Sequence, residues 1–188
     1  MSVPDRIHFT GDDEADALLA HDPLALLIGF ALDQQVTVQT AFAGPLKLRQ
    51  RLGHLDAARL AAMDPGELEA AFRERPAIHR FPGNMAKRVQ ALCAAITSDY
   101  DGDAARVWTD AGDAAALRAN LLALPGFGEM KVKALGSVLA KRFDVPAAQD
   151  LVPWHPTLGD VDSPQALTDY QAAKKLHKAE WLKARQPA

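Results

Sequence analysis

Two glycines on either side of one bulky residue could bind an anion through the main chain. They lie in the segment LPGFG, which is followed directly by EMKVKAL. Pro125 cannot continue a preceding helix, and Gly126 and Gly128 permit backbone angles and close approaches that other residues do not. A helix that starts after Gly128 has free N–H groups and a positive dipole end in its first turn. With Lys131 and Lys133 beside it, this turn predicts a phosphate-binding site.

A pair of glutamines, Gln34 and Gln35, provides the second set of polar groups. They follow Asp33 at the end of a strongly apolar stretch, residues 24–32. Buried amide side chains need hydrogen-bond partners, so a position at a junction that faces a cleft is favoured. The alternative is that both glutamines only cap helix ends.

Two motifs carry a resemblance to a known family. LPGFGEMKVKAL resembles the helix-hairpin-helix motif, Leu-Pro-Gly-hydrophobic-Gly, which grips a DNA phosphate without reading sequence; an ordinary corner between two helices is the alternative. The apolar stretch followed by Leu-Asp-Gln-Gln resembles the start of the HhH-GPD superfamily of DNA glycosylases, of the endonuclease III and 3-methyladenine glycosylase II type. GNMAKRVQAL, between the two motifs, is similar to a helix of that family.

The resemblance implies excision of a damaged or mismatched base that has been extruded from the duplex. In that family the residue at the position of Gln35 enters the duplex and fills the gap. Gln34 and Asp33 are then expected at the mouth of the base pocket, with Trp154 as a candidate wall, although an aromatic residue there more often packs into a core. The phosphate grip is expected to comprise Leu124, Gly126, Phe127, Gly128, Lys131 and Lys133.

The family spacing implies that Asp150 is the catalytic carboxylate, which stabilises the sugar cation or activates water. Two features depart from the family pattern, because Gln149 replaces a hydrophobic residue and Pro153 interrupts any long helix. The alternative is that Asp150 only caps a turn. Other aspartates that could serve are Asp144, Asp160 and Asp162.

Lyase activity in this family implies a lysine two residues after the second glycine, where this chain has Met130. Lys131 comes one residue later, about 100° further round the helix. A monofunctional glycosylase is therefore expected, with Lys131 and Lys133 as phosphate contacts.

The composition predicts an all-α fold. The 188 residues are 48% hydrophobic, alanine and leucine are abundant, and β-branched residues are sparse. The resemblance implies two lobes, residues 23–120 and residues 1–22 with 121–188, with DNA between them. A basic amphipathic helix is expected from residue 169 to 188, either packed on the hairpin or facing phosphates.

Several classes are disfavoured. The net charge of −3 does not itself indicate a nucleic-acid partner, so any DNA contact must be local. The single cysteine excludes a disulfide framework and a cysteine-ligated iron–sulfur cluster. The six histidines show no metal-ligand spacing, so no metal or cofactor is expected. No membrane segment or signal peptide is apparent, so a cytoplasmic location is expected. The alanine-, arginine- and aspartate-rich composition favours a bacterial source, and a monomer is expected.

Three functions stay open at this point. The first is a DNA glycosylase that acts on double-stranded DNA containing a damaged base. The second is a DNA-binding module of the same fold without catalysis, and the third is an unrelated helical interaction protein. The base itself cannot be inferred, because pocket walls come from distant segments.

Overall fold

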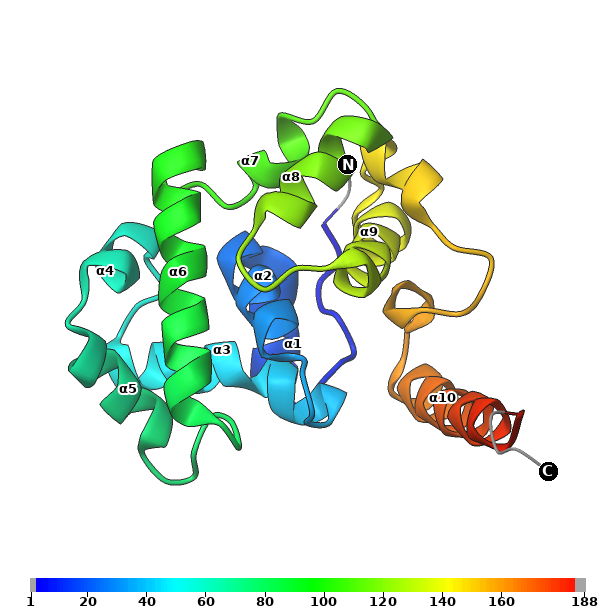
Figure 1. The fold of residues 1–188 in the computed structure, drawn as a ribbon, viewed down its shortest axis with the longest axis horizontal. Helices are drawn as coiled ribbons and strands as arrows, with labels where there is room; N and C mark the ends of the chain where they lie inside the picture. The colour runs from blue at the N-terminus through cyan, green and yellow to red at the C-terminus, as the bar shows by residue number, and fades with distance from the viewer. Residues whose placement is uncertain (1–2, 185–188) are drawn as a thin grey trace.

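The structure, a computed structural model, describes residues 3–184 and contains no strand in that range, which confirms the all-α prediction (Figure 1). The predicted residues 185–188 of the C-terminal helix lie outside the described residues. The α-helices are α1 (Asp13–His21), α2 (Pro23–Leu32), α3 (Val38–Leu52), α4 (Ala57–Ala62), α5 (Pro65–Arg73), α6 (Pro82–Tyr100), α7 (Arg106–Thr109), α8 (Ala114–Ala123), α9 (Glu129–Phe143) and α10 (Pro164–Ala184). Two short 3-10 helices, η1 (Pro146–Leu151) and η2 (Leu158–Asp160), separate α9 from α10.

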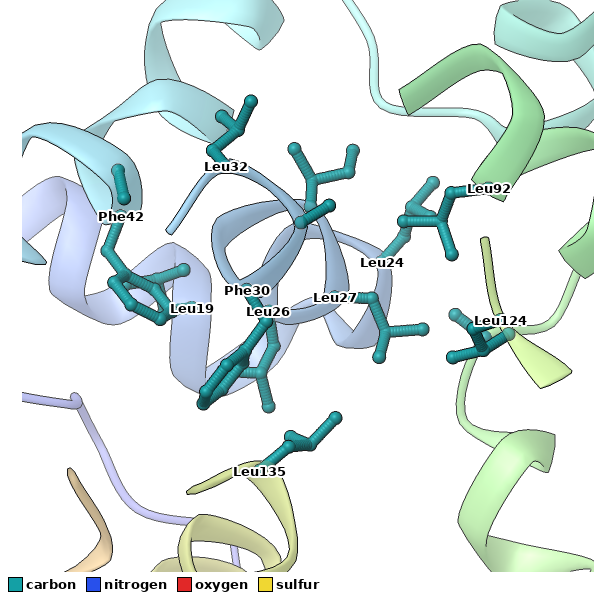
Figure 2. Close-up of a cluster of buried hydrophobic side chains, with 14 of the residues drawn as sticks. Leu19, Leu24, Leu26, Leu27, Phe30, Leu32, Phe42, Leu92, Leu124 and Leu135 are labelled. Carbon is teal, nitrogen blue, oxygen red and sulfur yellow. The ribbon is translucent and has the colours of Figure 1, made fainter. Parts of the chain in front are cut away.

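Helix α2 is the centre of the molecule. Every residue from Leu24 to Leu32 is buried. Leucines and phenylalanines from the surrounding segments point towards it (Figure 2). The main hydrophobic core extends from the N-terminal arm to α10, and a small second cluster comprises Ala15, Leu18, Ala25 and Leu46. A helix that is apolar on all sides must be covered by other elements on all sides. The polar residues that follow α2 therefore lie at the edge of the core.

Two glycines let α2 and α3 approach closely. A Cβ atom at Gly29 would lie 2.4 Å from the Phe42 ring, and one at Gly44 would lie 2.4 Å from Leu32 Cδ1. Asp22 caps the start of α2 and Thr37 caps the start of α3 through their side chains. Because both helices are held by packing and by caps, the connection between them, residues 33–37, has fixed ends.

The helices form two groups on either side of α2. Helices α4 and α5 pack on α6, whereas η1 and η2 pack on α9. Helix α1 packs on α2 and α3, and α3 in turn packs on α5 of the first group. The predicted division into lobes stays a prediction, since the continuous core joins both groups.

None of the helices within residues 3–184 is by itself long and apolar enough to cross a membrane; α1 and α2 reach that length and hydropathy only as a pair bent by 113°. Cys93 is fully buried, as expected for a small hydrophobic residue, and burial raises the pKa of its thiol to about 12.

Candidate nucleic-acid interface

The hairpin turn presents main chain rather than side chains. Leu124 and Phe127 are buried, at 3% and 6% exposure, and the Phe127 amide donates to the Leu124 carbonyl at 3.1 Å. Gly126 adopts a φ of 83°, which favours glycine. Gly126 and Gly128 are both exposed, and no side chain caps the N-terminus of α9 within the described chain. The turn therefore offers the amide groups and the dipole end that an anion site needs.

Arg88 of α6 joins the hairpin to the glutamine corner, residues 33–37. Its guanidinium donates a hydrogen bond to Gln34 Oε1. Its aliphatic part lies so close to the turn that a Cβ atom at Gly126 would be 2.8 Å from Arg88 Cδ. One cation thus contacts both motifs that the sequence singled out, although 90 residues separate them.

Lys131 forms a second link, but it points inward. Its ammonium group donates to the Ala31 carbonyl at 3.2 Å, at the C-terminal end of α2, and lies 5.7 Å from the Phe127 ring centre. Burial, followed by the positive charge of Arg88, lowers the pKa of Lys131 to about 8, and the negative charge of Asp33 opposes this shift. Lys131 therefore ties the hairpin to α2, while the exposed Lys133 is free to face a phosphate.

The glutamine corner carries local backbone strain. Gln35 has a φ of 58°, in the left-handed region that few residues other than glycine adopt. Asp33 caps the C-terminus of α2, and the Gln34 amide donates to the Leu32 carbonyl at 2.7 Å, which closes a three-residue turn. Gln34 and Gln35 are exposed. The strained corner therefore projects Gln35 away from the core.

A buried histidine holds this corner in place. His79 Nε2 lies 3.1 Å from both the Leu32 and the Gln34 carbonyl oxygens, and the Phe81 amide donates to Nδ1 at 3.0 Å. Since carbonyls only accept, Nε2 carries the proton and the neutral ring satisfies all three contacts. The imidazole, at 2% exposure, thus fixes the carbonyls on both sides of Asp33.

This contact predicts a pH-dependent stability. Burial lowers the pKa of His79 below 6.5, helped by the charges of Arg80 and Arg88 and opposed by the two carbonyl hydrogen bonds. The unfolded chain therefore takes up the proton first as pH falls below 6.5, and this contribution to the free energy of unfolding is lost there. His79→Phe should cost about 2 kcal/mol at pH 7.5, because the Leu32 and Gln34 carbonyls lose the imidazole donor and the Phe81 amide loses its acceptor.

Urea denaturation between pH 5 and 8 measures both effects. The difference between wild type and His79→Phe should shrink as pH falls below 6.5, because the protonated imidazole no longer accepts from the Phe81 amide. Parallel stability curves for the two proteins would contradict the assignment of a neutral buried ring. The exposed His177 offers the matched control, His177→Phe, for which no such difference is expected.

Asp33 places a carboxylate between the corner, α9 and α10. Burial raises its pKa, and the charges of Lys174 and Lys131 oppose that shift. Tyr170 of α10 shares this environment, because its pKa is raised by burial and then by the charge of Asp33. A partly buried carboxylate with cations on two sides is a common feature of functional sites.

Asp150 lies on another side of α9. It is exposed in η1, which packs on α8 and α9. The next residue, Leu151, packs at Gly136, where a Cβ atom would lie 2.9 Å from Leu151 Cβ. Gly136 follows Lys131 by five residues, or about 140° of helix rotation. Asp150 is thus attached to a different face of α9 from the one that meets α2.

The remaining candidates are separated from the hairpin. Trp154 is 96% exposed, so the alternative that it packs into the core is wrong. Its ring lies edge-on to the ring of His155, with the ring centres 5.6 Å apart. Asp160 accepts from Lys141 at 2.5 Å and from the Thr157 amide at 2.8 Å, which gives it a structural role. Asp144 is the C-cap of α9, and Asp162 is exposed.

Sequence reasoning missed three residues of the interface: His79, Arg88 and Tyr170. His79 stands in the irregular segment RERPAIHRFP, which gives no periodic signal. Arg88 falls opposite the apolar face of its helix, which is also the pattern of an ordinary solvated residue. No group of three histidine, cysteine, aspartate or glutamate side chains suited to a metal ion occurs within residues 3–184.

Comparison with known proteins identifies the family of this chain. Residues 28–185 match the model of a family described as HhH-GPD superfamily base excision DNA repair protein. No curated protein and no solved structure gives a significant match. The matched range includes the glutamine corner, Arg88, the hairpin and all of α10.

Proposed function

Because this chain belongs to the HhH-GPD superfamily of base excision DNA repair proteins, we propose that it is a DNA glycosylase. It hydrolyses the N-glycosidic bond of a damaged or mismatched base in double-stranded DNA. The hairpin turn and Lys133 bind a phosphate, Gln35 enters the duplex, and Gln34 and Asp33 face the extruded nucleotide.

The observation that carries this proposal is the junction between the hairpin and the glutamine corner. Arg88 contacts both Gln34 and Gly126, and Lys131 ties α9 to the end of α2. Phosphate contacts fix the register of a protein on DNA but carry no chemistry. A wedge held at a fixed distance from the phosphate grip lets the same binding event extrude a nucleotide, which costs a few kcal/mol.

Two carboxylates are candidates for the reaction. The spacing of the sequence supports Asp150, which stays a prediction, whereas the geometry of the junction favours Asp33. In the proposed step the bond between C1′ and the base nitrogen breaks, and its electron pair leaves with the base. A water oxygen bonds to C1′, and its proton passes to the ionised carboxylate, which also stabilises the cationic sugar.

The engagement of Lys131 supports a monofunctional reaction. Its amine donates to the Ala31 carbonyl and points towards α2, whereas a lyase nucleophile must reach the sugar carbon and form an imine. Borohydride should therefore not trap the protein on a duplex that contains an abasic site. A trapped complex that disappears in Lys131→Gln would contradict this assignment.

A panel of duplexes, each with one damaged or mismatched base, tests the function directly. We expect release of free base from at least one duplex, without strand cleavage at the resulting site. The undamaged duplex of the same sequence is the control. Salt-dependent binding without release from any duplex would instead favour a non-catalytic DNA-binding module of the same fold, and the absence of salt-dependent binding would favour an interaction protein.

Further properties stay predictions. We propose that the protein acts as a monomer without a cofactor, in the cytoplasm of a bacterium and close to its chromosome. Trp154, with its exposed ring, is proposed as a contact for a base, for which aromatic stacking supplies about 1–3 kcal/mol.

A further inference from the structure

Helix α10 is attached to the body only through its first turns. Leu167 is buried at 5% exposure, and Tyr170 is half-buried. Gln171 exchanges two amide hydrogen bonds with Gln39 of α3, at 3.2 and 2.8 Å. Gln39 lies in the first turn of α3, directly after the glutamine corner, so α10 passes beside this corner and then extends away from the other helices at the lower right of Figure 1.

The rest of α10 is exposed and basic. Every residue from 172 to 180 is exposed, including Leu176 at 67%. Residues 172–183 contain four lysines and one glutamate, a net charge of +3, whereas the whole chain carries −3; all other residues together therefore carry −6. This helix segment thus carries a net positive charge in an otherwise acidic protein. The lysines are Lys174, Lys175, Lys178 and Lys183.

The lysines of this segment repel one another, and among them Asp33 faces Lys174 alone in the described chain. Lys178 lies one turn from both Lys174 and Lys175, and like charges at that spacing destabilise a helix. A short helix segment that is exposed from residue 172 to 180 gains little stability from packing there. Within α10, Gln165 donates to Asp169, and the ring of Tyr170 lies beneath Lys174. An extended anionic surface along the lysines would remove this repulsion.

We propose that residues 172–183 of α10 lie along the phosphate backbone of the DNA next to the extruded nucleotide. This inference rests on the proposed function, because it takes the duplex to be held at the glutamine corner. Tyr170 and Lys183 are thirteen residues apart, or about 20 Å of helix. That length corresponds to roughly six base pairs at 3.4 Å per base pair. The contact is therefore one-sided: α10 extends the footprint in a single direction from the lesion.

The dependence of affinity on salt tests this contact. On a duplex of roughly 25 base pairs with a central reduced abasic site, each lost phosphate contact should lower the slope of log K against log salt by about 0.9. Lys175→Gln/Lys178→Gln should therefore lower the slope by about 1.8. Lys47→Gln/Arg59→Gln, which changes the net charge equally on α3 and α4, should leave the slope unchanged.

Two shortened duplexes test the direction of the contact. Each keeps the abasic site but has only about three base pairs on one side of it, so that about half of the roughly six-base-pair contact is lost. Wild type should lose slope on one of these duplexes only, by about as much as the lysine double variant loses on the full-length duplex.

The outcomes separate the two proposals. Salt-dependent binding by wild type with an equal slope in the lysine variant would overturn the role of α10 and leave the glycosylase proposal intact. Equal losses on both shortened duplexes would also overturn the one-sided contact. Absence of salt-dependent binding by wild type would overturn both proposals.

Discussion

Asp33→Asn is expected to lower the rate of base release by roughly 10²–10³-fold, the usual effect of losing one preorganised group that stabilises charge in the transition state. The amide keeps the size of the side chain but cannot take a proton from water or offset a positive sugar. Because Asp33 carries no phosphate contact in this proposal, the affinity for a duplex with an abasic site should change little. Single-turnover kinetics on the best lesion of the panel, together with binding to that duplex, measure the two quantities.

Asp150→Asn is the matched control, since it makes the same chemical change on the other side of α9. We expect it to release base at close to the wild-type rate. A large loss in Asp150→Asn with normal release in Asp33→Asn would instead support the spacing of the family and contradict the geometric argument.

The pH dependence gives a second test of Asp33. The reaction needs the ionised carboxylate, and burial raises the pKa of Asp33 above 3.8. The rate of base release should therefore rise with pH, with a midpoint above pH 3.8. The residual rate of Asp33→Asn should lack this acid limb. An unchanged acid limb in the variant would assign it to another group.

Gln35→Gly is expected to stabilise the fold while it impairs the reaction. The φ of 58° costs a residue with a Cβ about 1 kcal/mol, and glycine removes that cost. The same change removes the side chain that fills the duplex, so a base that is still paired should be extruded less often. We expect release from a paired lesion to fall by about 10–100-fold, equivalent to roughly 1.4–2.7 kcal/mol.

Two controls separate strain from the wedge. Gln35→Ala also lacks the amide but keeps a Cβ in the left-handed region, so it should lose release without gaining stability. Single-stranded DNA with the same lesion needs no wedge, and there all three proteins should act alike. Urea denaturation and single-turnover release provide the measurements; a loss of stability in Gln35→Gly would contradict the strain argument.

Some elements could be predicted from the sequence because their signals are local. Asp64 followed by Pro65 is a typical helix start, and the structure has α5 at Pro65–Arg73 with Asp64 as its cap. The hairpin was equally readable, since Pro125 ends one helix and the spacing of apolar residues defines the next. The apolar stretch before Asp33 required a buried helix, and α2 is the centre of the core.

Other features depend on contacts between segments far apart in the chain. Lys131 was predicted to face DNA from its place in the motif, but its amine is bound by the Ala31 carbonyl, 100 residues earlier. Gln35 adopts a left-handed backbone because α2 and α3 are anchored on either side of it, not because glutamine favours this conformation. A local pattern carries no information about which distant carbonyl or cation will lie beside it.

The sequence by itself determined the all-helical class, the family and the two motifs, because hydrophobic period, glycine and proline act over a few residues. The tertiary structure alone decided which charges meet: Arg88 between Gln34 and Gly126, and Asp33 beside Lys131 and Lys174. The physical reason is that burial of α2 draws these segments together, and the energies of charged groups depend on distance and desolvation, which only the packed chain defines.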